Sequence, residues 1–304
     1  MGSLIGHVVP GSFFIIFAIW WTYDAFRRYF ASLWQDRQFR ASTFSTSCNN
    51  CHINYSSPSE EQRKRSMPLS RIPPIEPTLK LLAVIFGMVG EYATALDDSG
   101  NFVAIHNGQH MTMFGFFAFN AIFELLYAYQ VPGLPPDLDY LTGAIAFAIE
   151  GLLFIWHLHG RSHLDTQVHT FLVYAIVMCV VSTILEIFFK DDVRPRLLRA
   201  GFTLLQGTWF FFVGFILYPP QGWKTWAPED HEQMMIVTMM FTWNVAGVLL
   251  FQLVLGCIVY LSMRRHFFKK PLLKKSPIDM NSNHGYTIVP ESDVMLNLLE
   301  DDEE

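Results

Sequence analysis

Long apolar runs recur along the chain and are separated by polar connections. Runs of about 20 residues lie near residues 8–30, 78–96, 110–129, 138–158, 167–189, 197–218 and 233–263. A helix needs about 20 such residues to cross the hydrocarbon core of a bilayer. Asp24, Arg27 and Arg28 interrupt the first run, so we expect its helix to end near Phe26. The pattern predicts an all-α polytopic membrane protein, a bundle of seven transmembrane helices.

Composition supports the same class. Of the 304 residues, 51% are hydrophobic and only 16% are charged, which is more apolar than a soluble domain of this size needs to be. We expect the lipid bilayer as partner and no nucleic acid. Residues 1–265 are expected to form the transmembrane domain, with a flexible cytosolic loop over 34–77. The polar residues 266–304 are expected to form a disordered cytosolic tail.

Lysine and arginine residues are concentrated in three segments outside the apolar runs, whereas the third connection, PGLPPD, has none and does not inform the orientation. They gather in the first connection, the fifth connection and the tail, at Arg37, Arg40, Arg63, Lys64, Arg65 and Arg71, at Lys190, Arg194 and Arg196, and at Arg264, Arg265, Lys269, Lys270, Lys274 and Lys275. The fourth and sixth connections carry only Arg161 and Lys224, and the second carries none. Because cytosolic connections carry the excess of positive charge, the amino terminus is predicted to be lumenal or extracellular and the carboxyl terminus cytosolic.

The predicted orientation places most of the histidines on one side of the membrane. Eight of the eleven fall on the predicted lumenal side, at His7, His106, His110, His157, His159, His163, His169 and His231. Glu150 lies inside an apolar run, where a carboxylate is costly and marks a functional or structural site. It precedes His157 by seven residues, so the two share one face of a helix. We therefore select one candidate lumenal cluster, composed of His110, Glu150, His157, His159 and His169.

Three interpretations of this cluster stay open. Imidazole and carboxylate ligands suit zinc, and a zinc-bound water with Glu150 or Glu91 as acid or base would make an intramembrane hydrolase acting on lipid. The titration range of histidine equally suits a pH-responsive cluster in an acidic compartment. The third interpretation is structural, in which these side chains only satisfy helix ends by hydrogen bonds.

Four other features carry expectations. Gly207 and Gly214 would permit close approach of a neighbouring helix. Gln206 lies at mid-depth in its run, and Glu124 is a buried acid for which the sequence names no partner. Glu186 is expected to pair with the basic fifth connection.

Two short motifs lie outside the apolar runs. Cys48, Cys51 and His52 spell the CxxCH signature of c-type haem attachment, but on the predicted cytosolic side such attachment does not normally occur, and a chance match is the favoured interpretation. In the tail, Tyr286 followed at the third position by Val289 resembles an endocytic and lysosomal sorting signal, which trafficking adaptors would read on the cytosolic side.

Several motifs together resemble the transmembrane protein 45 family, which includes an epididymal branch. They are GHVVPGSFF from residue 6, GE at 90, QH at 109, EG at 150, HLH at 157, LD before His169, LLQGTWF from 204, YPP at 218 and DHE at 230. The resemblance implies a seven-span protein of Golgi, endosomal, lysosomal or surface membranes without an established activity. It also implies that His110, Glu150, His157, His159, His169 and Gln206 are the family's polar signature.

The chain departs from the family pattern in the last span. Asn244 follows Trp243 where the resemblance implies a histidine. Asparagine is a poor zinc ligand, so this departure weakens the interpretation as a catalytic metal site. The sequence favours a non-enzymatic trafficking or regulatory membrane factor, with the zinc-dependent hydrolase as the alternative.

Overall fold

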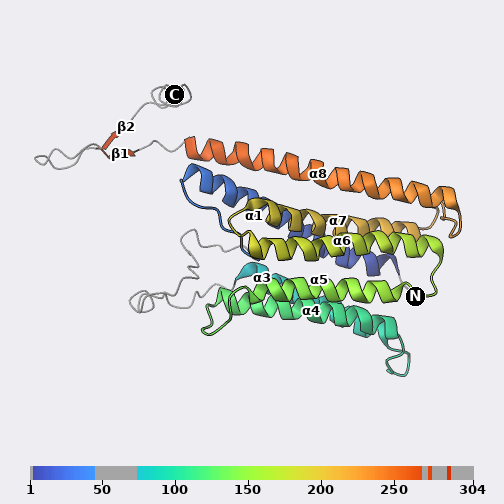
Figure 1. The fold of residues 1–304 in the computed structure, drawn as a ribbon. Helices are drawn as coiled ribbons and strands as arrows, with labels where there is room; N and C mark the ends of the chain where they lie inside the picture. Colours follow the sequence, from blue (N-terminus) through green and yellow to red (C-terminus); the bar gives the residue numbers. More distant parts are fainter. Residues whose placement is uncertain (1–2, 45–73, 269–272, 276–285, 289–304) are drawn as a thin grey trace, which may run out of the picture. The chain divides into compact units, whose positions relative to one another are not determined.

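The computed structural model describes residues 3–44, 74–268, 273–275 and 286–288. This part of the chain holds the long helices α1 (Leu4–Trp34), α3 (Ile75–Ala95), α4 (Ile105–Ala128), α5 (Leu138–His157), α6 (His163–Phe188), α7 (Val193–Leu217) and α8 (His231–Phe268) (Figure 1). All seven are long and apolar enough to cross a membrane, which confirms the predicted all-α class and number of spans.

The chain forms two compact units, Met1–Gly256 and Cys257–Glu304. In the first unit, neighbouring helices pack in the order α1, α7, α6, α5, α4, α3. The order nearly closes on itself, because α3 also touches α1, although these two helices make few contacts. We call this thin contact the α1–α3 seam. In the second unit, strands β1 (Leu273–Lys275) and β2 (Tyr286–Ile288) pair antiparallel, with Lys274 opposite Thr287.

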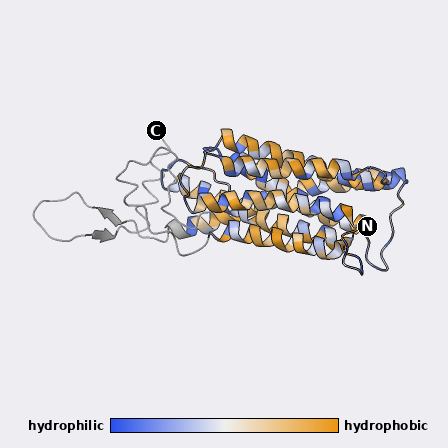
Figure 2. Ribbon diagram, turned by 90° about the horizontal axis from the view of Figure 1, so that it is seen from below, coloured by the Kyte–Doolittle hydropathy of each residue, from blue (hydrophilic) through white to orange (hydrophobic). Residues whose placement is uncertain are grey.

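Apolar side chains cover the outer faces of the helices. Figure 2 shows hydrophobic residues along the middles of the helices and hydrophilic residues toward their ends. Trp243 and Phe188 are 76% and 74% exposed, as large apolar residues in water rarely are. Such a surface suits contact with lipid.

Helix α1 continues eight residues past the end near Phe26 that the sequence predicted, so that expectation was wrong. The charges that suggested a break are paired with one another within α1 and, through Asp24, with α7. Asp24 accepts hydrogen bonds from Arg27 at 3.0 Å and from Arg196 of α7 at 2.8 Å. Arg28 Nε lies 2.7 Å from the same carboxylate. Because each charge has a partner, the helix does not need to end there.

Helices α1 and α7 approach closely through three glycines. A Cβ atom on Gly11 would lie 2.9 Å from the backbone oxygen of Gly207. A Cβ atom on Gly207 would lie 2.9 Å from the backbone nitrogen of Ile15, and one on Gly214 would lie 3.1 Å from His7 Cβ. The prediction that Gly207 and Gly214 permit close helix approach is therefore confirmed.

The connections at the His7 end of the bundle carry their own hydrogen bonds. In the turn between α3 and α4, Asp97 Oδ1 accepts from the backbone amides of Asn101 at 2.8 Å and Ser99 at 2.9 Å. These bonds hold the pKa of the Asp97 carboxyl below its usual range, with the amide of Asn101 as the largest cause. Between α5 and α6, Gly160 takes a φ of 77°, and Ser162 caps α6 by accepting from Asp165 N.

Candidate functional site

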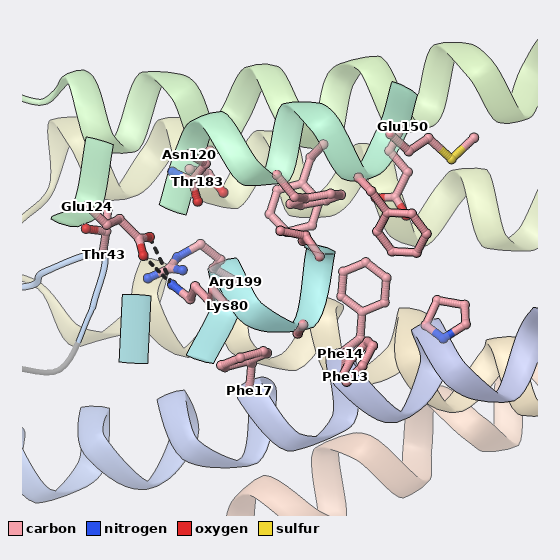
Figure 3. Close-up of a pocket in the computed structure, with 18 of the residues that line it drawn as sticks. Phe13, Phe14, Phe17, Thr43, Lys80, Asn120, Glu124, Glu150, Thr183 and Arg199 are labelled. Carbon is pink, nitrogen blue, oxygen red and sulfur yellow. Dashed lines mark hydrogen bonds and ion pairs between the residues drawn. The ribbon is translucent and has the colours of Figure 1, made fainter. Parts of the chain in front are cut away.

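A cavity of about 130 Å³ lies in the interior of the first unit. Its walls come from α1, α3, α4, α5, α6 and α7. Figure 3 shows Lys80, Glu124 and Arg199 at one end, Glu150 toward the other, and Phe13, Phe14 and Phe17 of α1 between them. The polar residues therefore form two separate groups. We call them the histidine end and the charged end, and each is described below.

At the histidine end, four imidazoles from four helices form a chain. The ring centroids of His7 and His169 are 5.8 Å apart, those of His169 and His157 are 6.3 Å apart, and those of His157 and His110 are 5.8 Å apart. These residues come from α1, α6, α5 and α4. The chain continues along α4, because His106 lies 6.4 Å from His110.

Carboxylates and one guanidinium flank this chain. His110 Nδ1 lies 3.1 Å from Glu91 Oε1 of α3, and His169 Nδ1 lies 2.8 Å from Asp165 Oδ1. Arg161, in the connection before α6, donates to Asp165 Oδ2 at 2.8 Å. The ring of His7 also packs 5.5 Å from that of Tyr218, just after α7. Titratable groups from α1, α3, α4, α5 and α6, and one residue just after α7, therefore lie at this cluster.

The hydrogen bonds of His157 define its neutral tautomer. Its Nδ1 lies 3.1 Å from the side-chain oxygen Oε1 of Gln109, so that nitrogen donates. Its Nε2 accepts from a nitrogen of the Arg161 guanidinium, which has no lone pair to offer in return. Protonation of His157 at Nε2 must therefore break the contact with Arg161.

The candidate cluster selected from the sequence divides in the structure. His110, His157 and His169 lie in the chain of imidazoles. His159 instead stacks on Trp156, with parallel rings 5.1 Å apart. Glu150 lies two helical turns from His157, and its Oε1 accepts from Gln206 at 2.7 Å. Gln206 therefore joins Glu150 and not the histidines.

The described residues hold no group of three histidine, cysteine, aspartate or glutamate side chains placed to bind a metal ion. The predicted zinc site stays a prediction. Asn244, which stands where the resemblance implies a histidine, donates to Thr208 Oγ1 at 3.0 Å. The CNNCH motif and Val289 lie outside the described residues.

The charged end was largely missed by the sequence reasoning. Lys80 of α3 lies 2.8 Å from Glu124 of α4 and 3.1 Å from Glu76. Two tryptophan indoles, Trp20 and Trp21 of α1, donate to Glu76 at 3.0 and 2.6 Å. Lys80 is thus the partner of Glu124 that the sequence did not supply.

A second ion-pair group adjoins it. Arg199 donates to Glu186 at 2.6 Å, and Tyr140 donates to the same carboxylate at 3.0 Å. Arg196 lies 3.6 Å from Glu186. The predicted pairing of Glu186 with the basic fifth connection is therefore confirmed, through Arg196. A signal for the missed residues was available, since Lys80 and Arg199 are charges inside apolar helices.

Known proteins resemble this chain over its carboxyl-terminal helices and beyond. Residues 136–257, from the start of α5 into α8, match a family described as "Family of unknown function (DUF716)". Transmembrane epididymal protein 1 of Homo sapiens is 24% identical over 169 residues, covering 56% of this chain and 61% of that protein.

Two rodent relatives show similar identity. Transmembrane epididymal protein 1A of Mus musculus is 21% identical over 249 residues, covering 81% of this chain and 77% of its own. Transmembrane epididymal protein 1 of Rattus norvegicus is 23% identical over 137 residues, covering 45% of each chain. These matches confirm the predicted resemblance to the transmembrane protein 45 family.

Proposed function

We propose that this protein, a member of the DUF716 family of unknown function, is a non-enzymatic membrane factor that responds to acid. One observation carries the proposal, namely the chain of His7, His169, His157 and His110 contributed by four different helices. Histidine changes its charge between pH 5 and 8. A change of charge at this junction acts on four helices together.

The charge balance predicts the direction of the response. With neutral imidazoles, Glu91, Asp165 and Arg161 give the cluster a net charge of −1. Four protonated imidazoles would change that to +3. Each added proton puts positive charge between packed helices, and a proton on His157 Nε2 competes with Arg161 for that nitrogen. We expect the histidine end to loosen as pH falls from about 7 to about 5.

The proposal places this end in the lumen or outside the cell. Its support is the charge count of the connections, since the basic first and fifth connections lie at the opposite end of the helices. The low pH of endosomes, lysosomes or the Golgi would then be the stimulus. At the cell surface, near neutral pH, the protein would be in its unstimulated conformation. An acid-dependent change of conformation would suit a regulatory or trafficking factor in those membranes.

The experiment measures thermal unfolding of the purified full-length protein in phospholipid nanodiscs between pH 7.5 and 5. Wild type is compared with a His110→Gln, His157→Gln double variant. The matched control is His159→Gln, His163→Gln, because His159 stacks on Trp156 and His163 is 76% exposed, outside the cluster. We expect wild type and control to lose on the order of 1 kcal/mol on acidification, and the cluster variant to lose little.

The proposal fails if the cluster variant and wild type respond equally to acid. It also fails if the control loses the response as completely as the cluster variant, since exposed histidines would then be responsible. Stoichiometric zinc in the purified protein, lost on His157→Ala, would favour the alternative of a zinc-dependent lipid hydrolase.

The tail signal is tested separately. Tyr286–Ile288 forms a strand in the second unit, and extended segments are a common form in which adaptors bind peptides. We propose that Tyr286 and Val289 direct internalisation from the surface. Surface biotinylation should show a larger surface fraction for Tyr286→Ala than for Thr287→Ala, which leaves both signal positions intact. Equal surface fractions would argue against the signal.

A further inference from the structure

The buried carboxylates of the described residues fall into two classes. Asp24, Glu76, Glu124 and Glu186 each lie within 4 Å of a lysine or arginine nitrogen. The other two, Asp139 and Glu150, have no cationic partner within the described residues, although they are each 3% exposed. Both line the cavity, and each has one oxygen without a hydrogen-bond partner there, Asp139 Oδ1 and Glu150 Oε2.

The two unpaired carboxylates differ in their surroundings. Asp139 lies in the first turn of α5, where the helix dipole and free backbone amides stabilise a negative charge. Its Oδ2 also accepts from Thr43 at 2.5 Å. Glu150 lies thirteen residues into the same helix, beyond the reach of that terminus. Gln206 satisfies one of its oxygens, and the other faces no donor. Of the two, Glu150 is therefore the carboxyl group that a cationic ligand would complement.

Aromatic rings surround this carboxylate. Phe147 and Phe154 lie three residues before and four residues after Glu150, on the same face of α5. The ring of Phe117 packs 5.4 Å from that of Phe147, and Phe210 packs 5.9 Å from Phe154. A positive charge over aromatic faces is stabilised by their quadrupoles. The wall thus suits an apolar body that carries a cation.

The size of the cavity limits the occupant. A volume of about 130 Å³ gives room for roughly ten groups the size of a water molecule. A small inorganic cation would leave most of this apolar space unfilled. A bulky two-chain lipid would not fit.

We propose that the cavity binds a hydrophobic amine with one apolar chain, whose protonated amino group pairs with Glu150 Oε2. The apolar chain lies between the phenylalanines of α1, α4 and α5. The ligand supplies the countercharge that the bundle gives to Asp24, Glu76, Glu124 and Glu186 but not to Glu150. An uncharged alcohol of the same length would donate a hydrogen bond but would leave the buried charge uncompensated. This proposal is independent of the acid response.

The test uses full-length protein in phosphatidylcholine nanodiscs and a photoreactive hexylamine with a diazirine in its chain. Hexylamine and hexanol, matched for concentration in the membrane, serve as competitors. We expect labelling on α1, α4 or α5 that hexylamine removes and hexanol does not. Glu150→Gln, which keeps the size of the side chain, should lower specific labelling about tenfold, the effect of one charge-assisted bond. Asp139→Asn, the matched carboxylate of the same cavity, should label like wild type.

Equal labelling of Glu150→Gln and wild type would overturn the proposal, as would equal competition by hexanol. Loss of labelling in Asp139→Asn with full labelling in Glu150→Gln would show that the amine binds Asp139 and not Glu150. This result would also overturn the proposal. If Glu150→Gln does not fold, Ala83→Phe tests the proposal instead. Ala83 lines the cavity from α3, and this substitution fills the cavity without changing any charged residue. Filling the cavity should abolish labelling, and undiminished labelling would contradict the proposal.

Discussion

The two ends of the bundle differ in the basic residues that they pair with carboxylates: lysine and arginine at one end, histidine at the other. At the charged end, Lys80 and Arg199 form ion pairs with Glu124 and Glu186, and both carboxylates are buried. At the histidine end, imidazoles lie beside carboxylates, and some of these groups are partly exposed, as His110 and Glu91 are at 26% and 19%. Buried ion pairs fix the positions of the helices at the charged end. At the histidine end the contacts include imidazoles, so the helix positions there can change with pH.

The largest expected effect comes from breaking the charged end. Lys80→Met leaves Glu124 and Glu76 buried without their cation, so we expect a loss of about 3–5 kcal/mol in the free energy of unfolding. Thermal or denaturant unfolding in nanodiscs measures it. Lys80→Met combined with Glu124→Gln should recover part of the loss. Arg194→Met is the control, because Arg194 is 84% exposed, and its stability should match wild type. A stable Lys80→Met single variant would refute the fixed role of this end.

A second effect tests whether the helix pairing itself is rigid. Gly207→Ala places a Cβ atom 2.9 Å from the backbone nitrogen of Ile15, so α1 and α7 must separate. We expect a loss of about 1–3 kcal/mol, as overpacking usually costs. Gly115→Ala on α4 has open space around its Cβ and should be neutral or slightly stabilising, since alanine favours helix more than glycine. The same unfolding assay decides, and equal stabilities would show that α1 moves freely.

A third prediction combines the two ends. The Lys80→Met, Glu124→Gln variant keeps the histidine cluster, so it should keep the acid response of wild type from a lower starting stability. His157→Gln should do the reverse, with near-normal stability at pH 7.5 and a weaker response at pH 5. The difference in unfolding free energy between the two pH values measures this. An acid response that disappears with the charged end would make the ends one coupled system.

The smallest effect on the acid response is expected from Asp97, in the turn between α3 and α4. The folded pKa of Asp97 is lowered, so its contribution is present above the ordinary aspartate range and is lost only as pH falls through the lower folded value. Between pH 7.5 and 5 it should therefore not change. Asp97→Asn should leave the acid response unaltered in the same assay. A weaker response in this variant would show that the carboxylates of the turns contribute, and not the histidines alone.

The sequence was sufficient for the helices and insufficient for their contacts. Apolar runs of spanning length predicted seven helices because the bilayer imposes that length. The first helix was cut short at Phe26, because the pairing of Asp24 with Arg196, 172 residues away, cannot be deduced from local pattern. Lys80 could have been selected as a charge inside an apolar helix, but its pairing with Glu124 of another helix could not be deduced in this way.

The candidate site shows the same limit. Spacing correctly placed Glu150 and His157 on one face of α5, but seven residues at 1.5 Å each separate them by about 10 Å along the axis. Sharing a face did not mean sharing a site. Gln206 became the partner of Glu150, and His7, at the far amino end, joined the imidazoles. Each partner came from a helix whose rotation about its own axis the sequence does not specify.

The α1–α3 seam has a consequence for how the cavity would be filled. A hydrophobic amine that enters between two thinly packed helices comes from the surrounding lipid and not from water. Its occupancy would then follow its mole fraction in the membrane. Because a bilayer concentrates amphiphiles, the concentration of the amine in water would underestimate its concentration around the protein. The same total amount of amine would therefore give different occupancies of the cavity in membranes with different lipid contents.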